Sequence, residues 1–512
     1  MFDHRTHGHV MGGTQSGKSK FIEACCRKHV EEGNGFCVLD WHGTLYEALA
    51  EYLAYRRPKQ RVILLDPGSE SIVPWNPFRK KDGTDISKQA GDLVELLANL
   101  SGMETTDQAP NFREYARTLF TYMAATGEPL QNASLLLEPE NISLRASALE
   151  TLKDYRRAQV SLNNISLYTK ATQYDFHVGS TRNRIGRLLD SRAIVRTMGM
   201  SLPGLDLDQV IEDNAIVLVN LSPAKMDAEA ARTFAALLLA EFMETALTNA
   251  GNERPYFVYC DECQNYLTRD AARLLDQSIK SGLRFTFVHH HMGQFTDPRL
   301  IASLETNAQL SFLFAGLPVV EAERYAKELF LRELNREKVR RERTRFITEH
   351  ELEAYETSDE SESSSDGGTV YEDGATSNFS STSGSAMHYG TRYAPRLREI
   401  PDTPEVWGRE EKLGQLSERL TTLTPGQCWI KTPAYAFFHE VPYVTHYFTK
   451  RANVLDFLKR ANKLAISGDE ADRIIRQQEQ DFIERSRPNA PSASVAKTTR
   501  AKKRPARLHP QE

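Results

Sequence analysis

Short, almost uninterrupted runs of apolar residues recur along the chain, separated by longer stretches in which apolar residues follow helical spacing. The runs are GFCVLD, RVILLD, AIVLVNL, YFVYCD, RFTFVHH and LSFLFAG. They are rich in β-branched and aromatic residues, which is typical of strands buried on both faces of a parallel sheet. Their alternation with helical stretches predicts an α/β domain with helices on both faces of a mainly parallel sheet.

Helical spacing dominates one interval, residues 79–181, which is too long for a single crossover helix. We therefore expect an all-helical domain inserted at 79–181, with residues 1–78 and 182–350 forming the two parts of the sheet domain. Further along, PGQCWIKT and AFFHEVPYV predict closing strands within 393–447. Two amphipathic stretches predict terminal helices within 448–487.

Two segments differ from the rest in composition. No Lys or Arg occurs between Arg345 and Arg392, and Ser, Gly and acidic residues predominate there, so 351–392 is predicted to be a disordered insert. The stretch RAKKRPAR has five basic residues in eight, and 488–512 is predicted to be a disordered basic tail. The tail has two interpretations, contact with DNA phosphates or a charge run that only aids solubility. The net charge of −5 does not reveal this uneven distribution of acidic and basic residues.

Cysteine and histidine patterns do not indicate a disulfide framework or a metal centre. Six cysteines in 512 residues are too few for such a framework. Cys260 and Cys263 have the C-x-x-C spacing but lack a second pair, which favours a structural role. His4, His7 and His9 could bind metal, but a flexible N-terminus explains them better.

Membrane insertion is not predicted. No apolar run approaches the roughly 18 residues that a membrane span needs, and no signal peptide precedes the first motif. We expect a cytoplasmic protein without a transmembrane segment of its own.

The first motif lies in VMGGTQSGKSKF, residues 10–21. Four residues separate Gly12 from Gly17, and Lys18 and Ser19 follow, so the backbone N–H groups of this loop could surround phosphate oxygens. Lys18 could reach the β- and γ-phosphates, and the Ser19 hydroxyl could bind Mg²⁺. A strand before the loop and a helix after it, as the pattern predicts, are the context that this motif needs. ATP and Mg²⁺ are the expected ligands, bound by Gly12, Gly13, Thr14, Gln15, Ser16, Gly17, Lys18 and Ser19.

A second motif supplies the acidic groups that hydrolysis needs. The apolar run in PYFVYCDECQNYL ends in Asp261 and Glu262. Asp261 could hold the metal ion, and Glu262 could polarise the attacking water. An ordinary surface turn is the alternative, but the pairing with a phosphate loop in one α/β domain favours the catalytic interpretation.

A third candidate follows the strand RFTFVHH, which ends in three histidines with a glutamine soon after. His290 or Gln294 could deliver a polar group that senses the γ-phosphate. His289 and His291 are expected to be packed or solvated, because successive strand residues point to opposite faces and would not share a metal ion.

Taken together, these stretches resemble the TraG/TraD-type coupling ATPases of conjugation and type IV secretion, within the HerA–FtsK superfamily of P-loop NTPases. The resemblance covers GGTQSGKS, VLDWHGTLYEAL, VILLDPGSESIVPWNPF, YCDECQNYL, SGLRFTFVHHHMGQF, LETNAQLSFLFAGLPVVEAERYAKEL and LTPGQCWIK, in the family's order. The Asp-Pro … Asn-Pro-Phe stretch before a helical region is the most specific part.

The resemblance implies a RecA-like motor that is usually a hexameric ring and moves DNA by ATP hydrolysis. The helical insert would match the family's all-alpha domain, with relaxosome or secretion-channel proteins as partners. Family members usually begin with a membrane anchor, so association with the inner membrane would here need a partner chain. The family's Gly-Arg-Lys is Ser278-Ile279-Lys280 here, and His290 occupies the position of the sensor glutamine.

A ring motor also needs an arginine that reaches the γ-phosphate of a neighbouring subunit. The stretch STRNRIGRLL contains Arg182, Arg184 and Arg187, and Arg184 is the candidate for this arginine finger. The candidate catalytic residues are therefore Glu262, His290 and Arg184. A solvated basic helix face is the alternative.

Two other functions remain open at this point. The chain could be a soluble HerA/FtsK-like motor that packages or processes DNA. It could instead be a nucleotide-binding adaptor that recruits substrate with weak hydrolysis.

Overall fold

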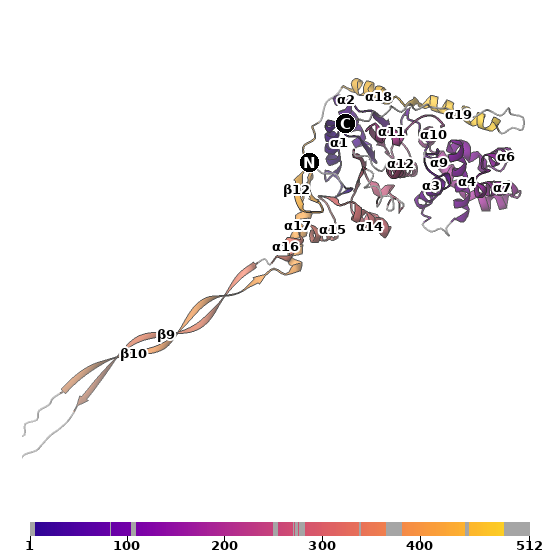
Figure 1. Ribbon diagram of the computed structural model, residues 1–512. Helices are drawn as coiled ribbons and strands as arrows, with labels where there is room; N and C mark the ends of the chain where they lie inside the picture. Colours follow the sequence, from indigo (N-terminus) through magenta and orange to yellow (C-terminus); the bar gives the residue numbers. More distant parts are fainter. Residues whose placement is uncertain are drawn as a thin grey trace, which may run out of the picture. The chain divides into compact units, whose positions relative to one another are not determined.

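The computed structural model describes residues 6–81, 83–103, 109–248, 254–269, 271, 275, 282–336, 339–364, 381–445 and 450–485. They fall into two compact units, one within residues 1–329 and 417–512 and the other within 330–416. Figure 1 shows the elements of each unit. The basic tail predicted at 488–512 lies outside the described residues.

The larger unit is built on a nine-stranded sheet with the order β12-β11-β8-β1-β7-β6-β2-β5-β3. The strands are β1 (Gly8–Met11), β2 (Phe36–Asp40), β3 (Val62–Leu65), β5 (Ile216–Asn220), β6 (Tyr256–Cys260), β7 (Leu283–His289), β8 (Leu310–Phe314), β11 (Gln427–Lys431) and β12 (Ala436–Glu440). The strands from β8 to β3 are parallel, whereas β11 and β12 are antiparallel to their neighbours. The predicted mainly parallel α/β fold is therefore confirmed, and each of the six apolar runs contains one strand.

Strand β1 lies near the middle of the sheet, with β7 on one side and β8 on the other. The helices α1 (Lys18–Glu32) and α2 (Thr44–Arg56) cover one face, where Phe21 and Ile22 of α1 and Leu49 of α2 join the core formed by alternate strand residues. The strands are short and buried along their length, so their polar groups gather where the strands end. Those ends form the candidate site.

A run of helices follows β3 and the short strand β4 (Ser71–Ile72) in the sequence. It consists of α3 (Ile86–Leu100), α4 (Pro110–Thr126), α5 (Leu130–Ser134), α6 (Ile142–Thr151), α7 (Arg156–Leu167), α8 (Ala171–Tyr174), α9 (Ser180–Asp190), α10 (Arg192–Met198) and α11 (Leu207–Glu212), with a π-helical turn at Asp175–Gly179. The predicted helical region is thus helical in the structure, but helix α9 straddles its expected end at residue 181, and α10 and α11 extend the run to Glu212.

The long helix α12 (Ala228–Thr248) lies between β5 and β6 in the sequence. The larger unit also contains α14 (Pro298–Asn307), α15 (Val319–Leu329), α18 (Arg451–Ala461) and α19 (Gly468–Arg485). No helix among the described residues is both long enough and apolar enough to cross a lipid bilayer.

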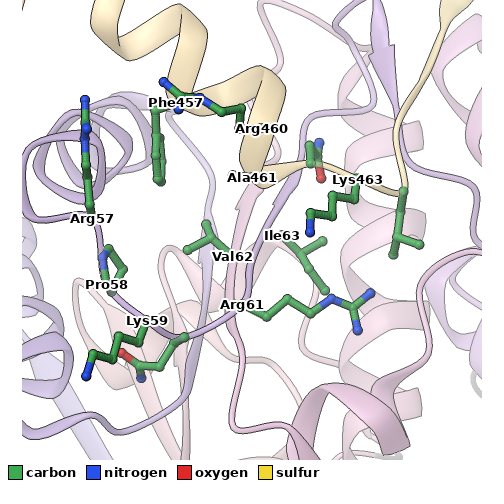
Figure 2. A pocket seen from close by; sticks show the side chains of 13 residues that line it. Arg57, Pro58, Lys59, Arg61, Val62, Ile63, Phe457, Arg460, Ala461 and Lys463 are labelled. Carbon is green, nitrogen blue, oxygen red and sulfur yellow. The ribbon is translucent and has the colours of Figure 1, made fainter.

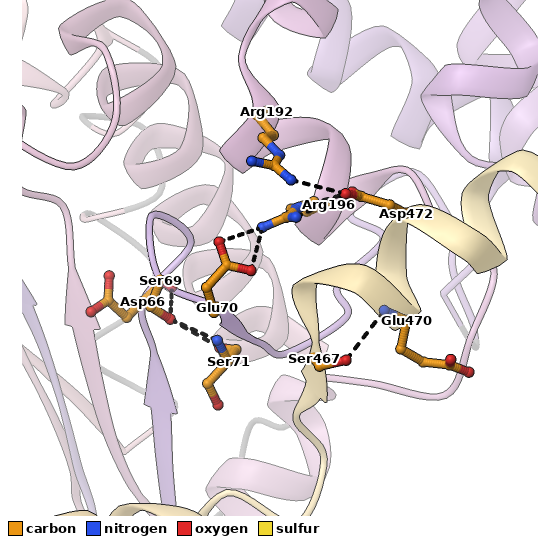
Figure 3. Close-up of polar contacts among 9 residues, drawn as sticks. All are labelled: Asp66, Ser69, Glu70, Ser71, Arg192, Arg196, Ser467, Glu470 and Asp472. Carbon is orange, nitrogen blue, oxygen red and sulfur yellow. Dashed lines mark hydrogen bonds and ion pairs between the residues drawn. The ribbon is translucent and has the colours of Figure 1, made fainter.

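Helix α19 is fixed to the helical region through a buried arginine (Figure 3). Arg196 of α10 is only 3% exposed and donates to both Glu70 and Asp472, at 2.8–3.0 Å. The Arg196 guanidinium holds the pKa of the Asp472 carboxyl well below its usual range. A two-stranded sheet of β4 (Ser71–Ile72) and β13 (Ile466–Ser467) lies next to these side chains. The contacts join segments that are far apart in the sequence.

The smaller unit contains α16 (Leu331–Asn335) and a two-stranded antiparallel hairpin of β9 (Val339–Ser364) and β10 (Ser381–Val406). Helix α17 (Arg409–Thr421) begins in this unit. The prediction of a disordered insert at 351–392 is therefore wrong for 351–364 and 381–392, which are strands, while 365–380 lies outside the described residues.

Cross-strand pairing explains why this sequence can form strands despite its polar composition. On one face, the pairs Glu349–Arg398, Glu351–Arg396 and Glu353–Arg392 form ion pairs across the two strands. The opposite face carries the exposed apolar residues Phe346, Leu352, Met387, Tyr389, Tyr393 and Leu397. Average composition hides this arrangement, because the ion pairs and these apolar residues lie on opposite faces of the hairpin.

Candidate nucleotide site

The phosphate loop connects β1 to α1, as the motif predicts. Gly12 and Gly17 have φ angles of 156° and 106°, and Gln15 has a φ of 61°. A Cβ at Gly12 would lie 2.6 Å from Cβ of Phe314, and a Cβ at Gly17 would lie 2.9 Å from the backbone nitrogen of Gly426. Glycine is therefore required at both positions for conformation and for space.

Backbone hydrogen bonds hold the loop against three other segments. The N–H of Gly12 donates to the carbonyl of His290 at 3.2 Å, and the N–H of Gly13 donates to that of Ala315 at 2.8 Å. The N–H of Gly426 donates to the carbonyl of Ser16 at 2.8 Å. The ends of β7 and β8 and the turn before β11 thus fix the loop from both sides.

The remaining loop residues are arranged as a phosphate site requires. Thr14, Gln15 and Ser19 are exposed at the start of α1, where the N–H groups and the helix dipole favour an anion. The Ser16 hydroxyl is buried and has no hydrogen-bond partner among the described residues. An orphaned hydroxyl beneath a glycine-rich loop is consistent with an oxygen-rich ligand at this position. The residues present therefore fit a nucleotide phosphate.

Lys18 points back into the loop. Its Nζ donates to the carbonyl oxygens of Gly12 and Gly13, both at 2.8 Å, and lies 3.2 Å from Nδ1 of His290. Burial lowers the pKa of the Lys18 ammonium, while the charges of Glu262 and Asp261 act in the opposite direction. A partly desolvated cation with weak carbonyl partners is suited to bind phosphate oxygens.

Asp261 and Glu262 follow β6, two strands from the phosphate loop. Burial, together with the nearby charges of Asp40 and Glu262, raises the pKa of the Asp261 carboxyl to about 8. A bound cation would favour the ionised form of such a carboxyl. Among the residues that the structure describes, no cationic side chain forms an ion pair with Asp261, although the Lys18 charge lowers its pKa. The fit to Mg²⁺ therefore rests on this buried carboxyl.

Glu262 adopts an unusual backbone conformation, with φ 48° and ψ 44°. The left-handed region is costly for a residue with a side chain, and it is common at functional sites. Here it turns the chain sharply between β6 and the short 3₁₀ helix Cys263–Asn265. One oxygen of Glu262 accepts a hydrogen bond from Nε2 of Gln264, and the other faces His290.

His290 connects the two motifs. Its Nε2 lies 3.4 Å from Oε1 of Glu262, and its Nδ1 lies 3.2 Å from Nζ of Lys18. Nδ1 also lies 3.1 Å from the carbonyl oxygen of Gly12, so it accepts from Lys18 in the tautomer that carries the proton on Nε2 and donates to Gly12 in the other. The first tautomer directs its Nε2 proton toward Glu262. The carbonyl oxygen of the Gln294 side chain accepts from the backbone N–H groups of His290 and His291 and fixes the turn. His290 is therefore the side chain that faces the site, and Gln294 supports it.

Sequence reasoning missed Asp40 as a site residue. It ends β2, and its two carboxylate oxygens accept from the backbone N–H groups of His42 at 3.0 Å and Tyr46 at 2.7 Å. Burial raises the pKa of Asp40, and its charge acts on Asp261. Its position at the end of a buried apolar run, similar to that of Asp261, was the available signal.

Arg184 is not brought to the phosphate loop by contacts within this chain. It donates to the carbonyl and hydroxyl oxygens of Ser180, and its guanidinium lies 5.3 Å from the ring centre of Phe112. Arg182 pairs with Glu138 at 3.8 Å. A role for either residue at a neighbouring subunit remains a prediction.

The histidine and cysteine predictions have mixed outcomes. His7 and His9 are buried, so the expectation of a flexible N-terminus is wrong from residue 6 onwards, while His4 lies outside the described residues. His9 contacts the hydroxyl of Ser311 at 2.7 Å, and strand pairing on both sides of β1 explains its burial. Cys260 and Cys263 are buried free thiols, and no metal-binding cluster occurs among the described residues.

Comparison with known proteins agrees with this geometry. Residues 3–160 match the family model of the type IV secretion-system coupling protein DNA-binding domain. The chain is similar to the coupling proteins of type IV secretion. The TraG/TraD-type resemblance found in the sequence is thereby confirmed.

Solved structures agree in fold. The plasmid coupling protein TrwB in complex with ADP and Mg²⁺ matches with a TM-score of 0.54 at 13% identity, covering 88% of each chain. TrwB in complex with the ATP analogue ADPNP matches with a TM-score of 0.53 at 12% identity, again over 88% of each chain. These likenesses show that the chain shares the α/β fold of TrwB, with its mainly parallel sheet and its helical region. No curated protein matches the sequence at a significant level.

Proposed function

We propose that this protein is an ATP-dependent motor that moves DNA, of the conjugative coupling type. The observation that carries the proposal is the chain of contacts from Lys18 through His290 to Glu262, which joins the phosphate loop to the acidic end of β6. ATP as the substrate is supported by the similarity to TrwB, whose structures include one with ADP and Mg²⁺. DNA as the polymer that is moved is supported by the similarity to the coupling-protein DNA-binding domain.

Each residue has a role that its position supports. Lys18 would neutralise charge on the β- and γ-phosphates. Ser19 and Asp261 would hold Mg²⁺, which supplies charge neutralisation at the phosphates. Glu262 would accept a proton from the attacking water, and His290, through Nε2, would hold Glu262 in place and respond to the γ-phosphate.

A ring would complete the site. The described contacts leave no arginine of the same chain at the phosphate loop, whereas RecA-like motors use one from a neighbour. We therefore propose a hexameric ring with Arg184 as the finger. DNA and relaxosome or secretion-channel proteins would be its partners, in the cytoplasm or at the inner membrane through another chain.

Two substitutions test the nucleotide chemistry. Lys18→Ala should abolish tight ATP binding, because it removes the cation that faces the phosphates. Glu262→Gln should leave ATP binding intact and lower turnover by about 10²-fold or more, because an amide cannot accept the proton. Equilibrium binding of a fluorescent ATP analogue and steady-state phosphate release measure the two effects.

Glu31→Gln is the matched control, since it makes the same carboxyl-to-amide change at an exposed position of α1. Wild-type turnover in the Glu262→Gln protein would refute the catalytic assignment. ATP binding without measurable turnover in the wild-type protein would instead favour the adaptor function.

A further inference from the structure

A basic pocket lies at the edge of the sheet, between the α2–β3 connection and the end of α18 (Figure 2). Its volume is about 650 Å³. Five of its lining residues are cationic, Arg57, Lys59, Arg61, Arg460 and Lys463, and none of the described lining residues is acidic. A pocket of this size can accept a ligand of several linked groups.

Most of this positive charge is not neutralised within the chain. Arg61 pairs with Asp213 at 3.3 Å, and Arg460 pairs with Asp456 on its own helix. Among the residues that the structure describes, no carboxylate forms an ion pair with Arg57, Lys59 or Lys463.

The negative ends of the helix dipoles offset only part of this positive charge. The α2 and α18 helices both end at the pocket, and each end carries about half a negative charge. Together the two ends offset about one of the three unpaired cations. A net positive charge remains in a recess, which favours a ligand with more than one negative charge.

The walls of the pocket are fixed. The side chain of Asn462 bonds the edge strand twice, donating to the carbonyl of Leu64 at 2.7 Å and accepting from its N–H at 3.3 Å. Arg57 has a left-handed backbone, with φ 48°, and its N–H donates to the carbonyl of Leu53 at 2.8 Å. Pro58 follows Arg57, which further restricts the chain. Hydrogen bonds and Pro58 therefore restrict the backbone segments that carry the cationic side chains.

The inner surface of the pocket is apolar. Val62 and Ile63 of β3 are buried, and Phe457 of α18 is half-buried against the same core. In Figure 2 the Phe457 ring and the Lys463 side chain extend toward Val62 and Ile63. Cations around an aromatic ring are the combination that binds single-stranded nucleic acid, because phosphates pair with the cations and a base stacks on the ring.

The pocket is separate from the nucleotide site. Val62 begins β3, whereas Asp40 is the last residue of β2 and Asp261 directly follows β6, and these strands are parallel within the same sheet. The two sites therefore lie at opposite ends of the strands.

We propose that this pocket binds a stretch of single-stranded nucleic acid, with backbone phosphates against the cationic side chains and a base against Phe457. The proposal rests on the proposed function, since it gives a DNA-moving protein a second point of contact with its polymer. A duplex is too wide to enter a recess of this volume, so the site discriminates between single and double strands.

Charge reversal in the full-length protein tests the site. Lys59→Glu combined with Lys463→Glu should lower the affinity for fluorescein-labelled oligothymidine by about tenfold or more. The slope of log affinity against log salt should become shallower by about 1.4, at about 0.7 for each of two lost phosphate contacts. Both lysines are exposed, so the fold should be unaffected. Fluorescence anisotropy at several salt concentrations measures both quantities.

Two further variants serve as controls. The first tests whether the location of the reversed charges matters, and the second tests whether the Phe457 ring contributes by stacking. Lys80→Glu with Lys327→Glu changes the net charge equally at exposed positions elsewhere and should leave the affinity near that of the wild type. Phe457→Leu keeps an apolar side chain but removes the ring, and it should weaken binding by about fivefold without changing the salt slope.

The outcomes distinguish this proposal from the one on which it rests. If the two charge-reversed double variants have equal affinity and salt slope while DNA still accelerates ATP hydrolysis, the pocket proposal alone is wrong. Loss of binding to phosphatidylglycerol vesicles with unchanged oligothymidine binding would also overturn it, in favour of a membrane surface. A wild-type protein that binds neither oligothymidine nor duplex DNA would refute both proposals.

Discussion

At the scale of single residues, His290 decides how the site would respond to its nucleotide. The side chain, which the sequence resemblance aligns with the coupling family's sensor glutamine, contacts both Lys18 and Glu262. A neutral imidazole can accept at Nδ1 and donate at Nε2, and a glutamine amide can also accept at one atom and donate at another. A glutamine at this position would therefore have the donor and the acceptor that both contacts need.

His290→Ala should lower the turnover number by about 10²-fold while changing nucleotide affinity little, because it removes the group that orients Glu262. His290→Gln should retain more activity than His290→Ala. His350→Ala, at an exposed position of β9, is the control. Steady-state phosphate release and nucleotide titration separate the two effects, and wild-type turnover in His290→Ala would show that the contact with Glu262 has no catalytic consequence.

The sequence predicts those site residues that follow local patterns. Gly12 to Ser19 have a fixed spacing, and Asp261 and Glu262 directly follow an apolar run. The contact between His290 and Glu262 could not be predicted in the same way. It depends on β7 lying next to β6, with Cys260 paired to Phe287, and on the left-handed backbone at Glu262.

At the scale of elements, three buried histidines make the sheet sensitive to acid: His7 directly before β1, His9 within β1 and His289 at the end of β7. Burial lowers the pKa of His7 and His9 to about 3 and that of His289 well below its ordinary value. The unfolded chain has a histidine pKa near 6.5, so below that pH the unfolded state binds protons that the folded state does not. The stabilising contribution is present above about pH 6.5 and is lost as the pH falls toward 3.

We expect the free energy of unfolding to fall by about 1.4 kcal/mol per histidine for each pH unit below about 6.5. Urea denaturation at pH 7.5 and pH 5.5 measures the difference. His9→Gln removes one titrating group while keeping a hydrogen-bonding side chain near Ser311, so its loss of stability should be smaller. An identical loss in the variant and the wild type would contradict the assignment.

Elements were predicted well where all apolar residues in a run are buried, as in β2, β5 and β6. They were predicted poorly in β9 and β10, where polar residues are frequent and each ion pair joins one strand to the other. The contacts of Arg196 with Glu70 and Asp472 were equally hidden, because 276 positions separate Arg196 from Asp472. Local composition reports burial, but it does not report cross-strand or long-range partners.

At the scale of the whole molecule, the proposed ring depends on a site shared between subunits. Arg184→Ala and Lys18→Ala should each abolish activity, but a mixture of the two proteins should recover part of it, because one provides an intact phosphate loop and the other an intact arginine. A mixture of Lys18→Ala with Glu262→Gln is the control. The two residues are proposed to act at the same nucleotide, so we expect little recovery.

Sedimentation in the presence of ATP and DNA gives the assembly state of the same samples. A monomer with full activity would refute both the ring and the shared site. A ring in which Arg184→Ala retains wild-type activity would refute only the choice of arginine.

The measurement that most directly tests the account is the rate of ATP hydrolysis with and without DNA. A DNA motor should hydrolyse ATP slowly alone and about tenfold or more faster with single- or double-stranded DNA, since polymer binding should complete the catalytic arrangement. Glu262→Gln should remove the stimulated rate. An unchanged rate with both forms of DNA, under conditions where DNA is bound, would contradict the proposal that this site drives DNA movement.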